Sequence, residues 1–63
     1  GDEPRAAMAT AERYHLEGQP RLALANAELA VRGLPQGSPD WIRAQDIAIV
    51  SRAAAEEEKR KHR

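Results

Sequence analysis

The sequence contains no cysteine and no phenylalanine, and its 63 residues include one tryptophan and one tyrosine. Without cysteine, neither a disulfide nor a thiolate metal site can hold the chain together. Lys and Arg together number 10, as do Asp and Glu, so the overall charge does not favour nucleic acid or an anionic membrane as a partner. No apolar run approaches the roughly 20 residues of a membrane span. A chain this short forms at most one small domain, which buries about 60% of its unfolded surface.

The first part of the chain predicts a helix over about residues 4–17. Pro4 suits the first turn of a helix, where its missing N–H is not needed. The apolar positions then repeat with the i, i+4, i+7 spacing of one helical face: Ala7, Ala11 and Tyr14. Gly18 is expected to end this helix, because glycine adopts the left-handed conformation of a C-terminal cap at least cost.

The middle of the chain predicts a second helix over about residues 19–33, rich in leucine and alanine. One of its faces carries Ala23, Ala27, Ala30 and Leu34. Because three of these residues are alanine, a neighbouring helix can approach closely there. Leu22 and Leu29 form a second apolar line, so we expect this helix to contact partners on two sides. Gly33 and Pro35 end it.

The last part predicts a third helix over about residues 38–60, with Ser38 as N-cap and Pro39 in the first turn. Its apolar positions fall on two lines: Trp41, Ala44 and Ala48, and Ile47, Val50 and Ala54. We expect Trp41 to hold this helix against the second one. In the polar tail, Glu56 and Glu57 are spaced to pair with residues 60 and 61, each one turn further on.

Three helices joined by short connections predict an all-α fold for residues 1–63, a helical hairpin with a third helix stacked on it. The spacing of certain residues resembles that of a tetratricopeptide repeat, which has a period of about 34 residues. The residues that carry this resemblance are Tyr14, Gly18, Ala23, Ala27, Ala30, Pro35 and Trp41. Ala7, Thr10 and Ala11 stand where the family has Trp, Leu and Gly, and Ala27 replaces a large aromatic residue. The repeat is therefore degenerate.

A narrower resemblance extends over nearly the whole chain. Residues 11–18 (AERYHLEG) and 41–47 (WIRAQDI) resemble the carboxy-terminal helical region of periplasmic M48-type zinc metallopeptidases that carry tetratricopeptide repeats. The catalytic element of that family is an H-E-x-x-H helix, which this sequence lacks. The resemblance implies an accessory region in the periplasm, whose partner is another protein or the rest of the parent chain. Since the sequence begins with Gly1 and not methionine, we expect it to be a piece of a longer protein.

No group of residues in the sequence has the types and spacing of a catalytic or metal-binding motif. His15 follows Glu12 by three positions, but a zinc site needs three or four ligands, so we interpret it as a surface histidine. Tyr14 and Trp41 are candidates for gripping a protein partner, with packing between helices as the alternative interpretation. The basic run 59–63 adjoins three glutamates and is interpreted as a solvated helix end. We predict no catalytic residue, no cofactor and no metal site.

These observations favour a non-catalytic protein-interaction or structural module. One alternative is a self-associating helical element that forms a homodimer through an exposed apolar line. Another is a fragment of an adaptor protein with tetratricopeptide repeats, unrelated to a protease. The sequence predicts no nucleic-acid partner and no membrane span for any of the three.

Overall fold

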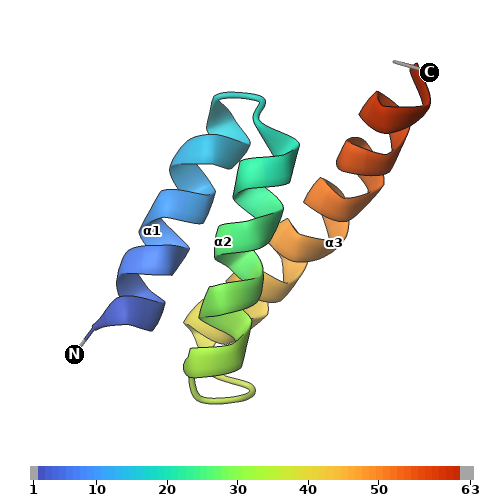
Figure 1. Cartoon of the computed structure of the whole chain (residues 1–63). Helices are drawn as coiled ribbons and strands as arrows, with labels where there is room; N and C mark the ends of the chain where they lie inside the picture. The colour runs from blue at the N-terminus through green and yellow to red at the C-terminus, as the bar shows by residue number, and fades with distance from the viewer. Residues whose placement is uncertain (1, 62–63) are drawn as a thin grey trace.

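The structure is a computed structural model that describes residues 2–61, and it consists of three α-helices: α1 (Glu3–Leu16), α2 (Pro20–Gly33) and α3 (Pro39–Lys61) (Figure 1). No strand occurs in residues 2–61, which confirms the prediction of an all-α fold. Each helix end lies within one residue of the position expected from the sequence. α1 and α2 form an antiparallel hairpin, and α3 packs along α2 and extends past the hairpin (Figure 1). α2 contacts both other helices, whereas α1 and α3 touch each other little.

The helix ends follow from local chemistry. Gly18 has the left-handed φ of +72° that a C-terminal turn requires, as predicted. Leu34, which follows α2, is extended with φ −83° and ψ 153°, the conformation favoured before a proline. The hydroxyl of Ser38 accepts a hydrogen bond of 3.2 Å from the backbone N–H of Trp41, which confirms the predicted N-cap. Local conformational preferences and capping at these residues therefore determine where the helices begin and end.

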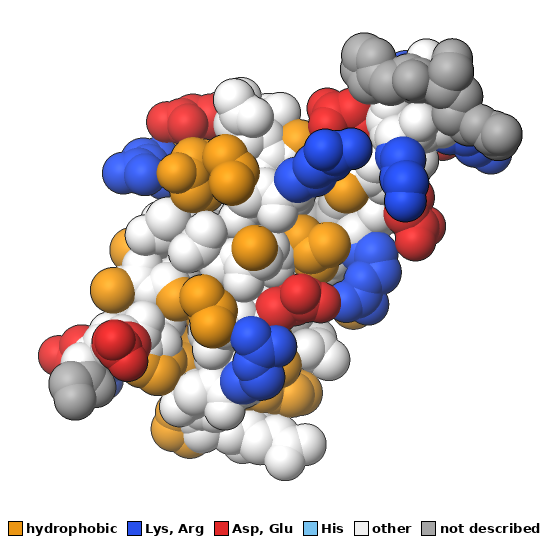
Figure 2. Space-filling model, in the orientation of Figure 1, with side chains coloured by type: hydrophobic (Ala, Val, Ile, Leu, Met, Phe, Trp, Pro, Cys, Tyr) orange, Lys and Arg blue, Asp and Glu red, His pale blue; other side chains and the backbone are white. Residues whose placement is uncertain are grey.

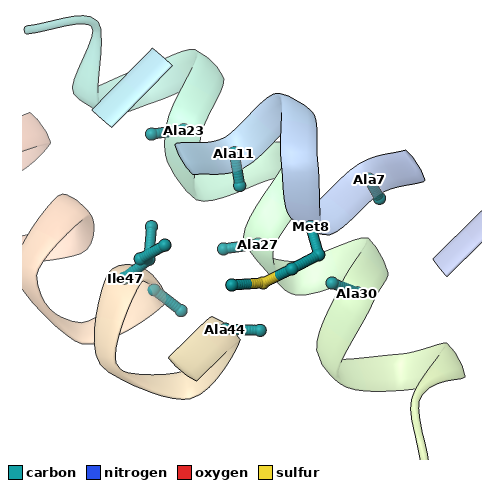
Figure 3. Packing of buried hydrophobic residues seen from close by; sticks show 9 residues of the cluster. Ala7, Met8, Ala11, Ala23, Ala27, Ala30, Ala44 and Ile47 are labelled. Atoms are coloured by element: carbon teal, nitrogen blue, oxygen red, sulfur yellow. The ribbon is translucent and has the colours of Figure 1, made fainter. Parts of the chain in front are cut away.

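The core between the helices is built mainly from alanine. Seven of its nine buried hydrophobic residues are alanine, and the other two are Met8 and Ile47. The alanine stripe of α2, which consists of Ala23, Ala27 and Ala30, is fully buried. Figure 3 shows these alanines between α1 and α3, with Met8 and Ile47 filling the space beside them. Because alanine side chains are short, the helix backbones approach closely, and the core gains contact without large side chains.

The larger apolar residues are placed differently from the expectation. Leu22 and Leu29, predicted to form a second contact line on α2, are 46% and 52% exposed. α2 does contact partners on two sides, but it does so through the alanine stripe, assisted by half-buried Leu24 and Val31. The physical reason is that the two neighbouring helices lie close to the alanine stripe, which leaves the leucines about a quarter-turn away uncovered.

Trp41 and the charged tail also differ from the expectation. Trp41 is half-buried, and the half-buried apolar residues that pack against the core are others: Tyr14, Leu24, Val31 and Leu34. Trp41 stands in the first turn of α3, at the edge of the packed region, so the core does not enclose it. In the tail, Arg60 pairs with Glu57 three positions earlier. The predicted pair between Glu56 and Arg60 is therefore wrong, as is the one between Glu57 and Lys61.

Two further ion pairs tie α3 to the hairpin at its surface. Arg43 of α3 binds Glu12 of α1 with a distance of 3.0 Å between nitrogen and oxygen, and Arg52 binds Glu28 of α2. All four side chains are well exposed, so solvent screens these pairs and each contributes at most about 1 kcal/mol. They help to fix how α3 lies on the hairpin, and the buried alanines supply most of the stability.

Replacing Ala27 by Leu is expected to destabilise the fold by about 1–3 kcal/mol, because the added atoms overpack a site with no exposed surface. Urea unfolding followed by circular dichroism measures the effect. Ala25→Leu is the matched control, since Ala25 lies exposed on the same helix. An Ala27→Leu midpoint equal to that of Ala25→Leu would contradict the close packing of α2 against its neighbours.

Gly33 is required by the close approach of the end of α2 to the start of α1. A Cβ atom on Gly33 would overlap the ring of Pro4. Alanine is normally more stable than glycine within a helix by about 0.5–1 kcal/mol, but here the overlap should reverse the sign. We expect Gly33→Ala to lower the melting temperature, and the additional change Pro4→Ala to recover most of the loss. A higher melting temperature for Gly33→Ala alone would show that the two helices separate easily.

Candidate functional site

An open cleft of about 550 Å³ lies between the turn that joins α1 to α2 and the C-terminal half of α3. The cleft arises from the difference in helix length, because α3 has 23 residues and α2 has 14. The nine additional residues extend α3 by about 13 Å at 1.5 Å per residue. Along this extension α3 separates from the hairpin, and no other helix in residues 2–61 faces it (Figure 1).

One wall of the cleft is formed by α3. It consists of Val50, Ser51, Ala54, Glu57, Glu58 and Lys61. These positions have the spacing i, i+1, i+4, i+7, i+8 and i+11, which places them on one face of a helix. The same face, one turn earlier, carries the buried residues Ala44, Ile47 and Ala48. The face of α3 that packs against the hairpin therefore continues, uncovered, into the cleft.

The opposite wall is formed by the end of α1 and the turn, through His15, Gly18, Gln19 and Pro20. Gly18 has no side chain and Pro20 has a short one, so this wall leaves room next to α3. The apolar part of the cleft is centred on Val50, which is 54% exposed, and Ala54. Glu57, Glu58 and Lys61 give its outer end a mixed charge.

Ser51 is the polar residue at the inner end of the cleft. It is 2% exposed, and its hydroxyl is the one buried side-chain group in residues 2–61 that has no hydrogen-bond partner. A buried hydroxyl without a partner costs about 1–3 kcal/mol. Such a group is rare in folded proteins and requires an explanation. Ser51 therefore marks the inner end of the cleft as the candidate site.

The residues proposed from the sequence lie mainly outside this cleft. Neither Tyr14 nor Trp41 lines it. Tyr14 is half-buried and packs against the core, with the guanidinium carbon of Arg13 lying 5.1 Å from its ring centroid. His15 does line the cleft. Of the basic run, residues 59–61 belong to α3, and residues 62–63 lie outside the described part of the chain.

Ser51 is not among the site residues predicted from the sequence. A signal was present, because Ser51 follows Ala44 by seven positions and Ile47 by four, which places it on the core-facing side of the helix. The exposure of Val50 had no such signal, since valine at helical spacing is typical of a core position. The face of the molecule drawn in Figure 2 shows hydrophobic side chains in several separate places, with charged side chains beside them.

Comparison with known proteins finds no match among family models, curated proteins or solved structures. Within residues 2–61, no helix is both long enough and apolar enough to cross a membrane. Nor does the described part of the chain bring together three His, Cys, Asp or Glu side chains in a group that could hold a metal ion.

Replacing Ser51 by Ala is expected to stabilise the isolated chain in dilute solution by about 1–3 kcal/mol, because the buried hydroxyl without a partner is removed. The higher helix propensity of alanine accounts for at most about 0.7 kcal/mol of this gain. Thermal unfolding measured by calorimetry gives the difference. A gain no larger than the propensity effect would mean that the hydroxyl already has a hydrogen-bond partner in the isolated chain.

Proposed function

We propose that this chain is a protein-interaction module that binds an amphipathic helix in the cleft beside α3. The observation that carries the proposal is the inverted distribution of apolar residues. The core is mostly alanine, whereas large apolar side chains are exposed: Leu16, Leu22, Leu29, Ile42, Ile49 and Val50. Single exposed apolar residues are common in proteins. Val50 differs from the others because it lines the cleft in which Ser51 lacks a partner.

The shape of the cleft suits a helix better than a small molecule. Its α3 wall presents residues at the i, i+4 and i+7 spacing with which one helix packs against another. Its volume of about 550 Å³ is enough for a few side chains from one face of a bound helix. Recognition of an amphipathic helix in an apolar groove is a recurrent form of protein binding.

The relation to tetratricopeptide repeats is part of this proposal. An array of such repeats stacks helices so that each unit covers the apolar face of the next. The hairpin of α1 and α2 with α3 packed against it is consistent with one and a half such units, and the uncovered face of α3 is where a following helix would lie. The spacing of Tyr14, Gly18 and Pro35 supports this interpretation.

An origin in the accessory region of an M48-type metallopeptidase rests on the residues of 11–18 and 41–47 alone. The gene that encodes the chain provides the test. An upstream H-E-x-x-H segment in the same reading frame would support this origin. A parent protein without that segment would favour the interpretation as an adaptor with tetratricopeptide repeats.

Selection of peptides from a display library against the immobilised chain tests binding in the cleft. We expect amphipathic helical peptides to be enriched, and their amide chemical-shift effects to centre on Val50, Ser51 and Ala54. Val50→Arg should lower their affinity at least tenfold, because the new charge would be buried under the bound helix. This substitution should leave the fold intact, since the side chain is exposed in the free chain.

Ile49→Arg is the matched control, because Ile49 is 61% exposed and lies next to Val50 but does not line the cleft. Its affinity for the selected peptides should equal that of the unmodified chain. The proposal would be contradicted if a monomeric chain enriched no peptides, or if both substitutions reduced binding equally.

A further inference from the structure

Five of the six residues of α3 that line the cleft are arranged symmetrically about one of them, Ala54. Relative to Ala54, Ser51 and Glu57 stand three positions away on either side, and Val50 and Glu58 stand four positions away. In an antiparallel pair of identical helices centred on Ala54, a residue that precedes Ala54 in one copy therefore faces the residue that follows Ala54 by the same number of positions in the other copy. The two surfaces are then the same patch on both copies, as a twofold interface requires.

The chemistry of the opposed residues agrees with this symmetry. Ala54 meets Ala54 of the second copy, and two short side chains allow the helices to approach closely. Ser51 meets Glu57 of the second copy, whose carboxylate can accept a hydrogen bond from the buried hydroxyl. Val50 meets Glu58 of the second copy, whose methylene groups can cover the exposed valine while its carboxylate remains at the edge.

Other arrangements of the same two helices fit less well. An antiparallel pair centred on Glu57 or Glu58 would place a carboxylate opposite its own copy, and a parallel pair would do so at both positions. A pair centred nearer the start of α3 would need Ile47 and Ala48, which are buried in the hairpin and, unlike Ser51, do not line the cleft. Of the positions that line the cleft, Ala54 is the one about which four of the others are symmetric.

We infer that the helix bound in the cleft is the C-terminal half of α3 from a second copy of this chain, so that two copies form an antiparallel dimer centred on Ala54. This inference rests on the proposed function and names the partner. One face of each copy's α3 extension fills the cleft of the other copy, beside the turn that joins α1 to α2. The dimer provides a hydrogen-bond acceptor for both buried Ser51 hydroxyls.

Because the chain has no cysteine, a single introduced thiol reports the arrangement directly. In an Ala54→Cys variant the two thiols would face each other across the twofold axis, within the separation that a disulfide spans. Under mild oxidation we expect disulfide-linked dimers to form at least ten times faster than for Ile49→Cys, the control on the other side of α3. Both positions are exposed, so neither change should disturb the fold, which circular dichroism verifies.

Sedimentation equilibrium gives the second measurement. The unmodified chain should show a monomer–dimer equilibrium that depends on concentration. Ala54→Arg should weaken it at least tenfold, because the long charged side chain would meet its own copy at the centre of the interface. Ile49→Arg should leave the dimer unchanged.

The possible outcomes separate this inference from the proposed function. A chain that stays monomeric but binds selected peptides in the cleft would overturn the dimer and keep the interaction module. A monomer that binds no peptide would overturn both. A dimer in which Ala54→Cys crosslinks no faster than Ile49→Cys would place the interface elsewhere and would also overturn the inference.

Discussion

Ala23, Ala27 and Ala30 are the residues through which α2 meets both of its neighbours, and none of them has exposed surface. Their short side chains allow α1 and α3 to approach the backbone of α2 closely, so the core is held by many contacts at short range rather than by large side chains. This constraint has consequences beyond the core. Gly33 must remain without a side chain where α2 passes Pro4, because the two helices are already in close contact there.

The close packing also determines what remains outside. Helices that meet along a narrow line of alanines cannot cover a wide apolar face, so the leucines of α2 and the isoleucines at the surface of α3 stay exposed. The hairpin reaches only part of the way along α3, since α3 is nine residues longer than α2. The cleft is therefore a result of the same packing that stabilises the fold, and the face that lines it is an extension of the face that forms the core.

Ser51 stands at the boundary between these two environments. On its N-terminal side the face is apolar and covered, and on its C-terminal side the face carries Glu57 and Glu58 and is open. A hydroxyl at this boundary is buried by the hairpin without receiving a hydrogen-bond partner from it. A residue that departs from the usual pattern of a folded protein, such as a buried hydroxyl without a partner, is often at a functional position. This is the physical basis for proposing the cleft, rather than Tyr14 or Trp41, as the binding site.

The sequence by itself determined the three helices and their ends, because Gly18, Ser38 and the four prolines act on the chain locally. It also determined the alanine face of α2, since spacing along a helix fixes which residues share a side. Only the tertiary structure decided which apolar residues are covered, because that depends on where α2 ends relative to α3 and on how closely the helices approach. For this reason Val50 is part of a cleft, Trp41 is only half-buried, and Arg52 pairs with Glu28 far away in the chain.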